Sequence, residues 1–198
     1  MFLREEILDA ARELFVKHGY ENVSMRKIAD KIEYSPTTIY LYFHDKAEIL
    51  RTLCEETFNR LSKIMVDIEH GPGDPVTRLR HQGEAYIRFG LEHPNHYHVT
   101  FMVPHEYSEK TAEELINSAG MRTFQSLVNC VKDCVDAKQF RDVDVLAASQ
   151  ALWCAVHGVT SLLIAQTCFP WVKQEQLIGT LLDAMMEGYR ARQSRRRT

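Results

Sequence analysis

The chain has 198 residues, of which 45% are hydrophobic and 26% charged, so it can bury a sizeable core in one domain or two small ones. Its formal net charge of −3 excludes an overall basic domain, so nucleic acid could be bound only through a local cationic face. Five cysteines without a Cys-x-x-Cys pair, no signal-peptide stretch and no apolar run that spans a bilayer predict a cytoplasmic protein without membrane contact.

Apolar stripes and capping residues mark the first four predicted helices. The first helix carries one apolar stripe and stops at Gly19. Ser24 caps a second helix, and Ser35 caps a third with Pro36 at its first position, where the missing N–H group costs nothing. Asp45, with a glutamate three residues later, begins a fourth helix that runs to about residue 70.

The rest of the chain is also predicted to be helical. The stretch 71–75, Gly-Pro-Gly-Asp-Pro, is the clearest break, and no segment alternates with period two. We predict an all-α fold in which three short N-terminal helices are joined by a long fourth one to a larger bundle, with domains at 1–50 and 51–198. The predicted helices of the bundle lie at about 75–92, 94–103, 108–138, 142–168 and 173–193.

The second and third helices have the lengths and spacing of a helix-turn-helix, in which the second of the pair enters the DNA major groove. Thr37 and Thr38 place hydroxyl and methyl groups at its leading end, where base edges are read. Ile39 and Phe43, four residues apart, are predicted to pack its rear face on the other helices. We expect the flanking side chains to reach phosphates, including the hydroxyls of Tyr40 and Tyr42 and the cation of Lys46 beside a helix N-terminus.

Residues 4–50 resemble the DNA-binding domain of the tetracycline-repressor (TetR) family. The resemblance rests on ILDAA at 7–11, LF at 14–15, HGY at 18–20, VSMRKIA at 23–29, SPTTIYLYF at 35–43 and Lys46. Where that family usually has a small residue and glycine in the turn, this chain has Ile32-Glu33-Tyr34, which predicts a positive φ at Glu33. The resemblance implies a homodimer that binds a two-fold operator and represses transcription until a small molecule binds the C-terminal domain. It also implies a DNA-facing set of Ser24, Arg26, Lys27, Ser35, Pro36, Thr37, Thr38, Tyr40, Tyr42, His44 and Lys46.

Each member of that set has a simpler interpretation as a capping, packing or solvated side chain. Capping and phosphate contact use the same helix ends, so Ser24 and Ser35 are expected to cap in either case. For Tyr40 the alternative is packing alone, and for Lys46 it is a solvated charge.

The last two predicted helices, 142–168 and 173–193, are apolar on more than one side. More apolar surface than one core face needs indicates a second buried face, and we expect a dimer interface there. The alternative is a core in which both helices are surrounded within one chain.

Trp153, His157 and Gly158 also resemble a Trp-x-x-x-His-Gly signature of one subgroup of TetR C-terminal domains. Trp153 and His157 lie one helical turn apart, as a pocket wall or, in the simpler interpretation, as core residues with the histidine bonded to a carbonyl. An unknown small-molecule effector could lie among rings that could equally fill the core: Tyr86, Phe89, Tyr97, Phe101, Phe124, Trp153 and His157.

Two histidine and cysteine groupings look like metal sites at first sight. His93, His96, His98 and His105 lack a carboxylate or cysteine at a ligand spacing, so a polar helix junction is favoured over a metal. Two cysteines at 130 and 134 share a helix face and are read as small buried side chains rather than a redox or metal pair. We therefore predict no metal and no cofactor, and read the arginine-rich tail as a solvated end.

Three functions remain open from the sequence. The leading one is a dimeric, sequence-specific repressor that a small molecule releases from its operator. An all-α enzyme is the first alternative, although no nucleophile triad, phosphate-binding glycine loop or carboxylate pair supports it. The second is an architectural DNA-binding protein without an effector.

Overall fold

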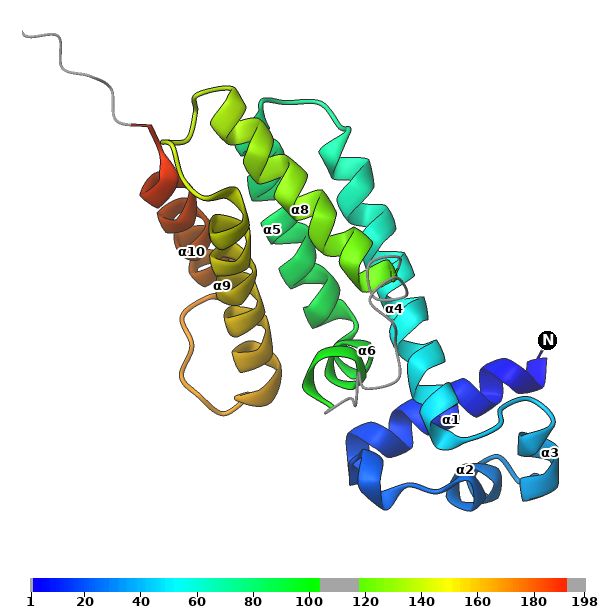
Figure 1. Cartoon of the computed structure of the whole chain (residues 1–198). Helices are drawn as coiled ribbons and strands as arrows, with labels where there is room; N and C mark the ends of the chain where they lie inside the picture. The colour runs from blue at the N-terminus through cyan, green and yellow to red at the C-terminus, as the bar shows by residue number, and fades with distance from the viewer. Residues whose placement is uncertain (1, 104–117, 192–198) are drawn as a thin grey trace, which may run out of the picture. The chain divides into compact units, whose positions relative to one another are not determined.

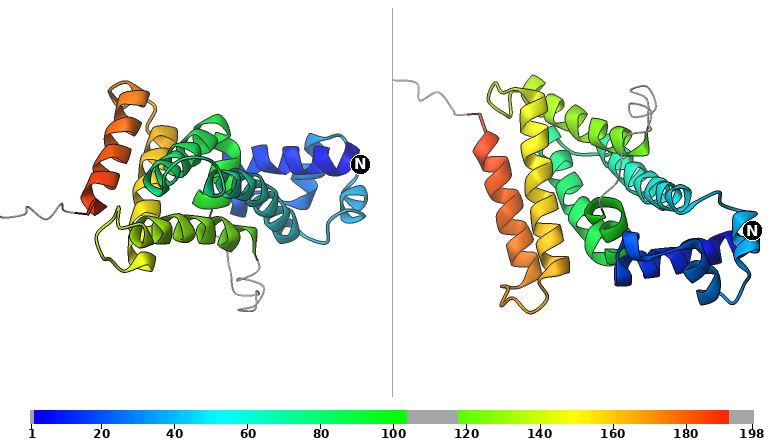
Figure 2. Two further views of the ribbon diagram at one scale, coloured as in Figure 1. Left: turned by 90° about the horizontal axis from the view of Figure 1, so that it is seen from above. Right: turned by 60° about the horizontal axis from the view of Figure 1, so that its bottom comes forward.

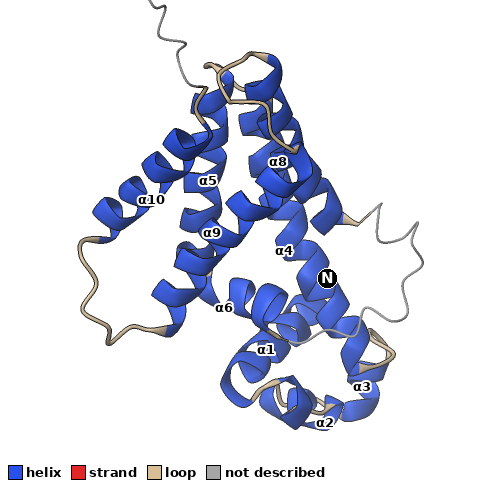
Figure 3. Ribbon diagram, turned by 60° about the vertical axis from the view of Figure 1, so that its left-hand side comes forward, coloured by secondary structure: helices blue, strands red, loops and turns tan. Residues whose placement is uncertain are grey.

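The computed structural model describes residues 2–103 and 118–191, and within these ranges every regular element is a helix (Figures 1 and 3). Outside the helices, an isolated antiparallel bridge joins Phe140 to Arg190. The predicted all-α fold is confirmed. The elements are α1 (Phe2–His18), η1 (Tyr20–Asn22), α2 (Met25–Lys31), α3 (Pro36–Tyr40), α4 (Lys46–Glu69), α5 (Pro75–Glu92), α6 (Pro94–Tyr97), η2 (His98–Met102), α8 (Ala119–Asp136), α9 (Val145–Ala165) and α10 (Gln174–Tyr189).

Several helices begin or end away from their predicted bounds, for local reasons. The predicted helix 94–103 is divided into α6 and the π-helix η2. The start of α9 is set by Asp144, whose side chain accepts a hydrogen bond from Ala147 N–H. The last helix stops at Tyr189 because the next residue is extended and joins the bridge to Phe140. The first part of the predicted helix 108–138 lies outside the described residues.

The described chain forms two compact units. One consists of residues 2–60 and 93–103 with Ser118, and the other of residues 61–92 and 119–191. The long helix α4 contributes its first part to one unit and its end to the other.

In the first unit, α1 to α3 and the start of α4 enclose one apolar core. The stripe of α1 predicted from the sequence is buried, as in Phe15 at 0% exposure, and α3 adds Ile39. The segment after α5 also belongs to this core, because Val99 and Val103 pack in the same cluster. The helix-turn-helix is therefore completed by residues far along the chain.

The second unit is a bundle of α5, α8, α9 and α10 with the end of α4. In Figures 2 and 3, α9 and α10 run side by side and are joined by the loop 166–173. Its core contains Leu79, Cys130, Val131, Cys134, Phe140, Ala148, Leu152 and Met186.

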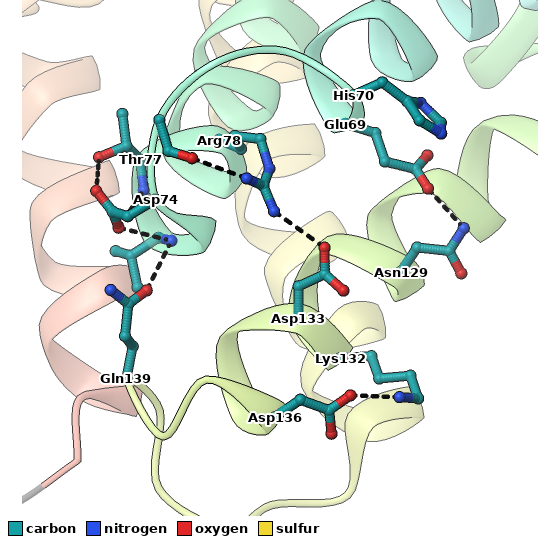
Figure 4. A network of polar contacts seen from close by, with 12 residues as sticks. Glu69, His70, Asp74, Thr77, Arg78, Asn129, Lys132, Asp133, Asp136 and Gln139 are labelled. Atoms are coloured by element: carbon teal, nitrogen blue, oxygen red, sulfur yellow. Dashed lines mark hydrogen bonds and ion pairs between the residues drawn. The ribbon is translucent and has the colours of Figure 1, made fainter.

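Polar contacts hold one end of this bundle together (Figure 4). Arg78 donates to Gly73 O at 2.8 Å and to an oxygen of Asp133 on α8 at 3.0 Å. Asp74 caps α5, and hydrogen bonds from Thr77 hold the pKa of its carboxyl below the usual value. Asn129 donates to Glu69 at 2.8 Å. These contacts tie the ends of α4 and α8 to the start of α5.

Candidate DNA interface and effector site

The caps predicted for the helix-turn-helix are present and set its geometry. Ser24 Oγ accepts from Lys27 N–H, and Ser35 Oγ accepts from Thr38 N–H with Pro36 at the start of α3. Glu33, in the turn, has φ 61°, as predicted from the glycine that the TetR family usually has in this turn.

The rear of α3 is anchored as predicted, which leaves a defined outer face. Ile39 and Phe43 are buried at 0% and 2% exposure. Tyr40 and Tyr42 are 55% and 41% exposed, so their phenol groups reach solvent rather than the core. Packing alone therefore does not account for Tyr40, and its outward position suits a contact with a flanking phosphate.

The two threonines are not equivalent. Thr37 is exposed, whereas Thr38 is half-buried and its Oγ1 lies 2.9 Å from Ser35 Oγ. Thr38 N–H also donates to Ser35 Oγ, at 3.2 Å. The hydroxyl of Thr38 is thus already used within α3, and Thr37 is the more available of the pair.

The basic side chains of the predicted set differ in how strongly they are bonded within the protein. Arg26 is 83% exposed, with only a 4.0 Å approach to Asp30. Lys27 Nζ donates to Asn22 O at 2.8 Å. His44, at 92% side-chain exposure, lies beside Asp45. Arg26 and His44 can therefore move toward a phosphate at little cost.

Lys46 has a structural role that the sequence pattern did not reveal. Its Nζ donates to Tyr20 O at 2.8 Å and lies 4.0 Å from the centroid of the Tyr20 ring. The lysine therefore links the start of α4 to η1, just after α1. An ammonium group has three donors, so a phosphate contact remains chemically open.

The rings predicted to hold an effector fall into both units. Tyr97 is fully buried in the first unit, where its ring packs at a tilt against Phe101 with centroids 4.8 Å apart. The other five belong to the second unit. Tyr86 and Phe89 are buried, His157 and Phe124 are half-buried, and Trp153 is 39% exposed.

Three of these side chains form a hydrogen-bonded relay. Trp153 Nε1–H donates to Tyr86 Oη at 3.2 Å, and Tyr86 Oη lies 3.2 Å from His157 Nδ1. The simplest assignment has the phenol proton donated to Nδ1, which places the imidazole proton on Nε2. Burial lowers the pKa of His157, consistent with a neutral ring. The histidine is thus bonded to a tyrosine hydroxyl, a partner that the sequence did not predict.

Gln82 is a polar residue of this region that the sequence analysis missed. It is 2% exposed, and its Nε2 donates to Met65 O at 3.0 Å and to Ser126 Oγ at 2.8 Å. Its Oε1 is buried without a hydrogen-bond partner among the described residues. Gln82 lies one turn before Tyr86 on α5, and a glutamine among apolar positions of an amphipathic helix was the available signal.

The histidine and cysteine groupings show no metal geometry within the described residues. No three His, Cys, Asp or Glu side chains in those ranges are placed to hold an ion; His105 lies outside them. Burial, with the charges of Arg12 and Arg60, lowers the pKa of His96 to about 4. Cys130 and Cys134 are fully buried, and burial raises the pKa of both thiols to about 12. Their interpretation as small core side chains is confirmed.

Several large apolar side chains of α9 and of the loop after it are exposed. By length and composition α9 could cross a membrane, with a mean hydropathy of 1.3 over 18 residues, of which 28% are buried in the described structure. One such helix is weak evidence for a span, because core helices pass the same test. The exposed large side chains here are Leu146, Trp153, Leu162, Phe169 and Val172.

Comparisons with known proteins agree with the geometry. Residues 7–53 match the family model of bacterial regulatory proteins of the tetR family, and residues 79–189 match that of the tetracyclin repressor-like C-terminal domain. The second match alone covers more than half of the chain. This family is one of regulators and not a class of enzymes.

Curated relatives match parts of the chain. The transcriptional repressor AcnR of Corynebacterium diphtheriae is 31% identical over 64 residues, which are 32% of this chain and 34% of AcnR. The repressor KstR of Mycobacterium tuberculosis is 38% identical over 58 residues, 29% of this chain and 26% of KstR. The matched region thus spans about a third of the length of these repressors.

Solved structures extend the likeness over nearly the whole fold. PfmR of Thermus thermophilus, a TetR-family regulator, superposes with a TM-score of 0.74 at 21% identity, covering 91% of this chain and 97% of PfmR. A tetR-family regulatory protein from Rhodococcus gives 0.80 at 17% identity, covering 96% and 98%. With a capped helix-turn-helix at one end and a matching C-terminal domain at the other, the chain belongs to the TetR family of bacterial regulatory proteins.

Proposed function

We propose that this protein is a dimeric, sequence-specific DNA-binding repressor that a small molecule releases from its operator. The observation that carries the proposal is α3, a short helix with a buried rear face and the exposed residues Thr37 and Tyr40, followed directly by exposed Tyr42. A rigid element of this kind suits insertion into a major groove. The similarity of about a third of the chain to the repressors AcnR and KstR supports it.

The two proposed activities are assigned to consecutive parts of the chain. Residues 1–50 contact DNA, and residues 51–198 bind the effector and the second copy. The DNA-facing set remains the one given above, with Thr37 ahead of Thr38 as a base reader. A repressor of this kind works where the chromosome is, in the cytoplasm.

The proposed effector site is built on the relay of Trp153, Tyr86 and His157. We also assign the Trp-x-x-x-His-Gly stretch to the corresponding subgroup of C-terminal domains, since Trp153 and His157 meet through Tyr86. The buried Oε1 of Gln82 favours an effector, or a water that it displaces, with a hydrogen-bond donor. Phe89 and Phe124 form an apolar wall of the proposed effector site.

The proposed dimer joins α9 and α10 of two copies. The exposed apolar residues of α9 and of the following loop support this arrangement, because water is a poor environment for large apolar side chains.

The test is selection of duplexes from a random DNA pool, followed by fluorescence anisotropy with a selected duplex. A regulator enriches a motif with two-fold symmetry and releases it when one compound of a metabolite library is added. An enzyme enriches nothing, and an architectural protein binds DNA but ignores every compound. Either result contradicts the proposal.

A further inference from the structure

The direction in which α3 faces is set by its anchor. Ile39 is fully buried, and successive residues of a helix are about 100° apart, so residues two positions away lie on the opposite side. Those residues are Thr37 and Leu41. Leu41 keeps helical dihedrals, φ −72° and ψ −20°, so it continues the line of Thr37 one turn further on.

Leu41 is the more unusual member of this line. It is 79% exposed, although it is a large apolar side chain in a segment that has buried positions available at Ile39 and Phe43. Single exposed leucines are common on protein surfaces and need no explanation by themselves. This one lies on the side of α3 opposite its core anchor, the side that faces DNA in the proposed function.

The chemistry of the major groove restricts what an isobutyl group can recognise. Guanine, cytosine and adenine present hydrogen-bonding atoms there, whereas thymine alone presents a methyl group. The hydroxyl of Thr38, which could otherwise have formed a hydrogen bond with a base edge, is bonded to Ser35. The outer line of α3 therefore offers mainly methyl groups, from Thr37 and Leu41.

We propose that Leu41 is a specificity-determining residue that contacts the 5-methyl group of a thymine in each operator half-site. This inference rests on the proposed DNA-binding function and adds the identity of one base that the protein recognises. The neighbouring Tyr40 and Tyr42 are both exposed, and their hydroxyl groups contact the DNA phosphates on either side of Leu41.

The experiment uses the full-length protein and a duplex selected from the random pool. Each thymine is replaced in turn by deoxyuridine, which removes the methyl group and leaves base pairing intact. At one thymine per half-site, wild-type affinity falls about fourfold, the effect of removing one methyl group from an apolar contact. The slope of log K against log salt does not change, because no charge is altered.

Variants assign the effect to its residue. Leu41→Ala loses a similar factor on thymine DNA and no longer distinguishes deoxyuridine, whereas Leu41→Met keeps the discrimination. Thr37→Ser, which removes the other methyl group of the line, still distinguishes the two bases at that position. Circular dichroism melting confirms that the exposed Leu41 variants remain folded.

Two results would overturn the inference while leaving the proposed function intact. One is an operator bound equally with thymine and deoxyuridine at every position. The other is a deoxyuridine effect that persists in Leu41→Ala and disappears in Thr37→Ser. If no duplex is selected at all, the proposed function itself fails, so the two failures are distinct.

Discussion

Glu33 occupies a backbone conformation that most residues avoid. With φ 61° in the turn between α2 and α3, its Cβ is crowded, whereas glycine adopts this conformation without penalty. We expect Glu33→Gly to unfold with a free energy about 1 kcal/mol higher than Glu33→Ala in urea titrations. The alanine variant removes the same charge and keeps the strain, so equal stabilities would rule out strain at this turn.

Lys46 combines a structural bond with a proposed phosphate contact. Lys46→Ala removes the bond to Tyr20 O and should lower the free energy of unfolding by about 1 kcal/mol. It should also weaken operator and random DNA by the same factor and reduce the salt slope by about one. Lys63→Ala, at an exposed site on α4, is the control for a general loss of charge. A loss confined to the operator would contradict the phosphate role.

On α5, one side chain joins three helices. Gln82 holds α4 through Met65 O and α8 through Ser126 Oγ, and its Oε1 is buried without a partner in the described parts of the chain. Gln82→Met keeps the volume and removes every hydrogen bond of the side chain. We expect a variant that binds operator normally but needs at least about fivefold more effector for release, measured by anisotropy, because a lost bond to a buried polar group costs about 1–3 kcal/mol. Exposed Gln125→Met on α8 is the control, and an unchanged release curve would exclude Gln82 from the effector site.

The short helix α6 carries a histidine whose titration reports on packing. The pKa of His96 is lowered to about 4 by burial and by nearby charges, those of Arg12, Arg60 and His93, against which Asp9 acts weakly. The unfolded chain takes up this proton below about pH 6.5, but the folded chain does so only near pH 4. The associated stability is complete above about pH 6.5 and is lost as the pH falls toward about 4.

His96→Gln removes that dependence. The free energy of unfolding of the wild type should fall more steeply than that of His96→Gln between about pH 6.5 and 4, measured by urea unfolding at a series of pH values. His18→Gln, at an exposed position of α1, is the control. Parallel curves for wild type and His96→Gln would show that His96 titrates alike in the folded and unfolded chain.

For the whole molecule, the exposed apolar side chains of α9 predict that two copies of the chain associate. Leu162 is 49% exposed, and a charge placed there would be buried in a dimer at a cost of several kcal/mol. We expect sedimentation equilibrium to give twice 23.0 kDa for the wild type and 23.0 kDa for Leu162→Arg. Val66→Arg, on α4 and 39% exposed, should remain a dimer. A wild-type monomer would contradict the dimer.

Features that depend on neighbours within about four residues could be predicted from the amino-acid sequence alone. Ser24 and Ser35 cap their helices because the serine oxygen needs only a backbone N–H three residues away. Ile39 and Phe43 are buried because their spacing places them on one side of the chain. The positive φ of Glu33 could be predicted because the TetR family usually has glycine in this turn, and glycine adopts a positive φ without penalty.

Features that depend on contacts between distant segments became known only from the folded chain. No local pattern could join Val99 to the core of the helix-turn-helix, bond Lys46 to Tyr20 or bury the Oε1 of Gln82. The relay of Trp153, Tyr86 and His157 likewise needs α5 and α9 side by side. Periodicity shows which side of a helix is apolar, but the identity of its partners is set by how the helices pack.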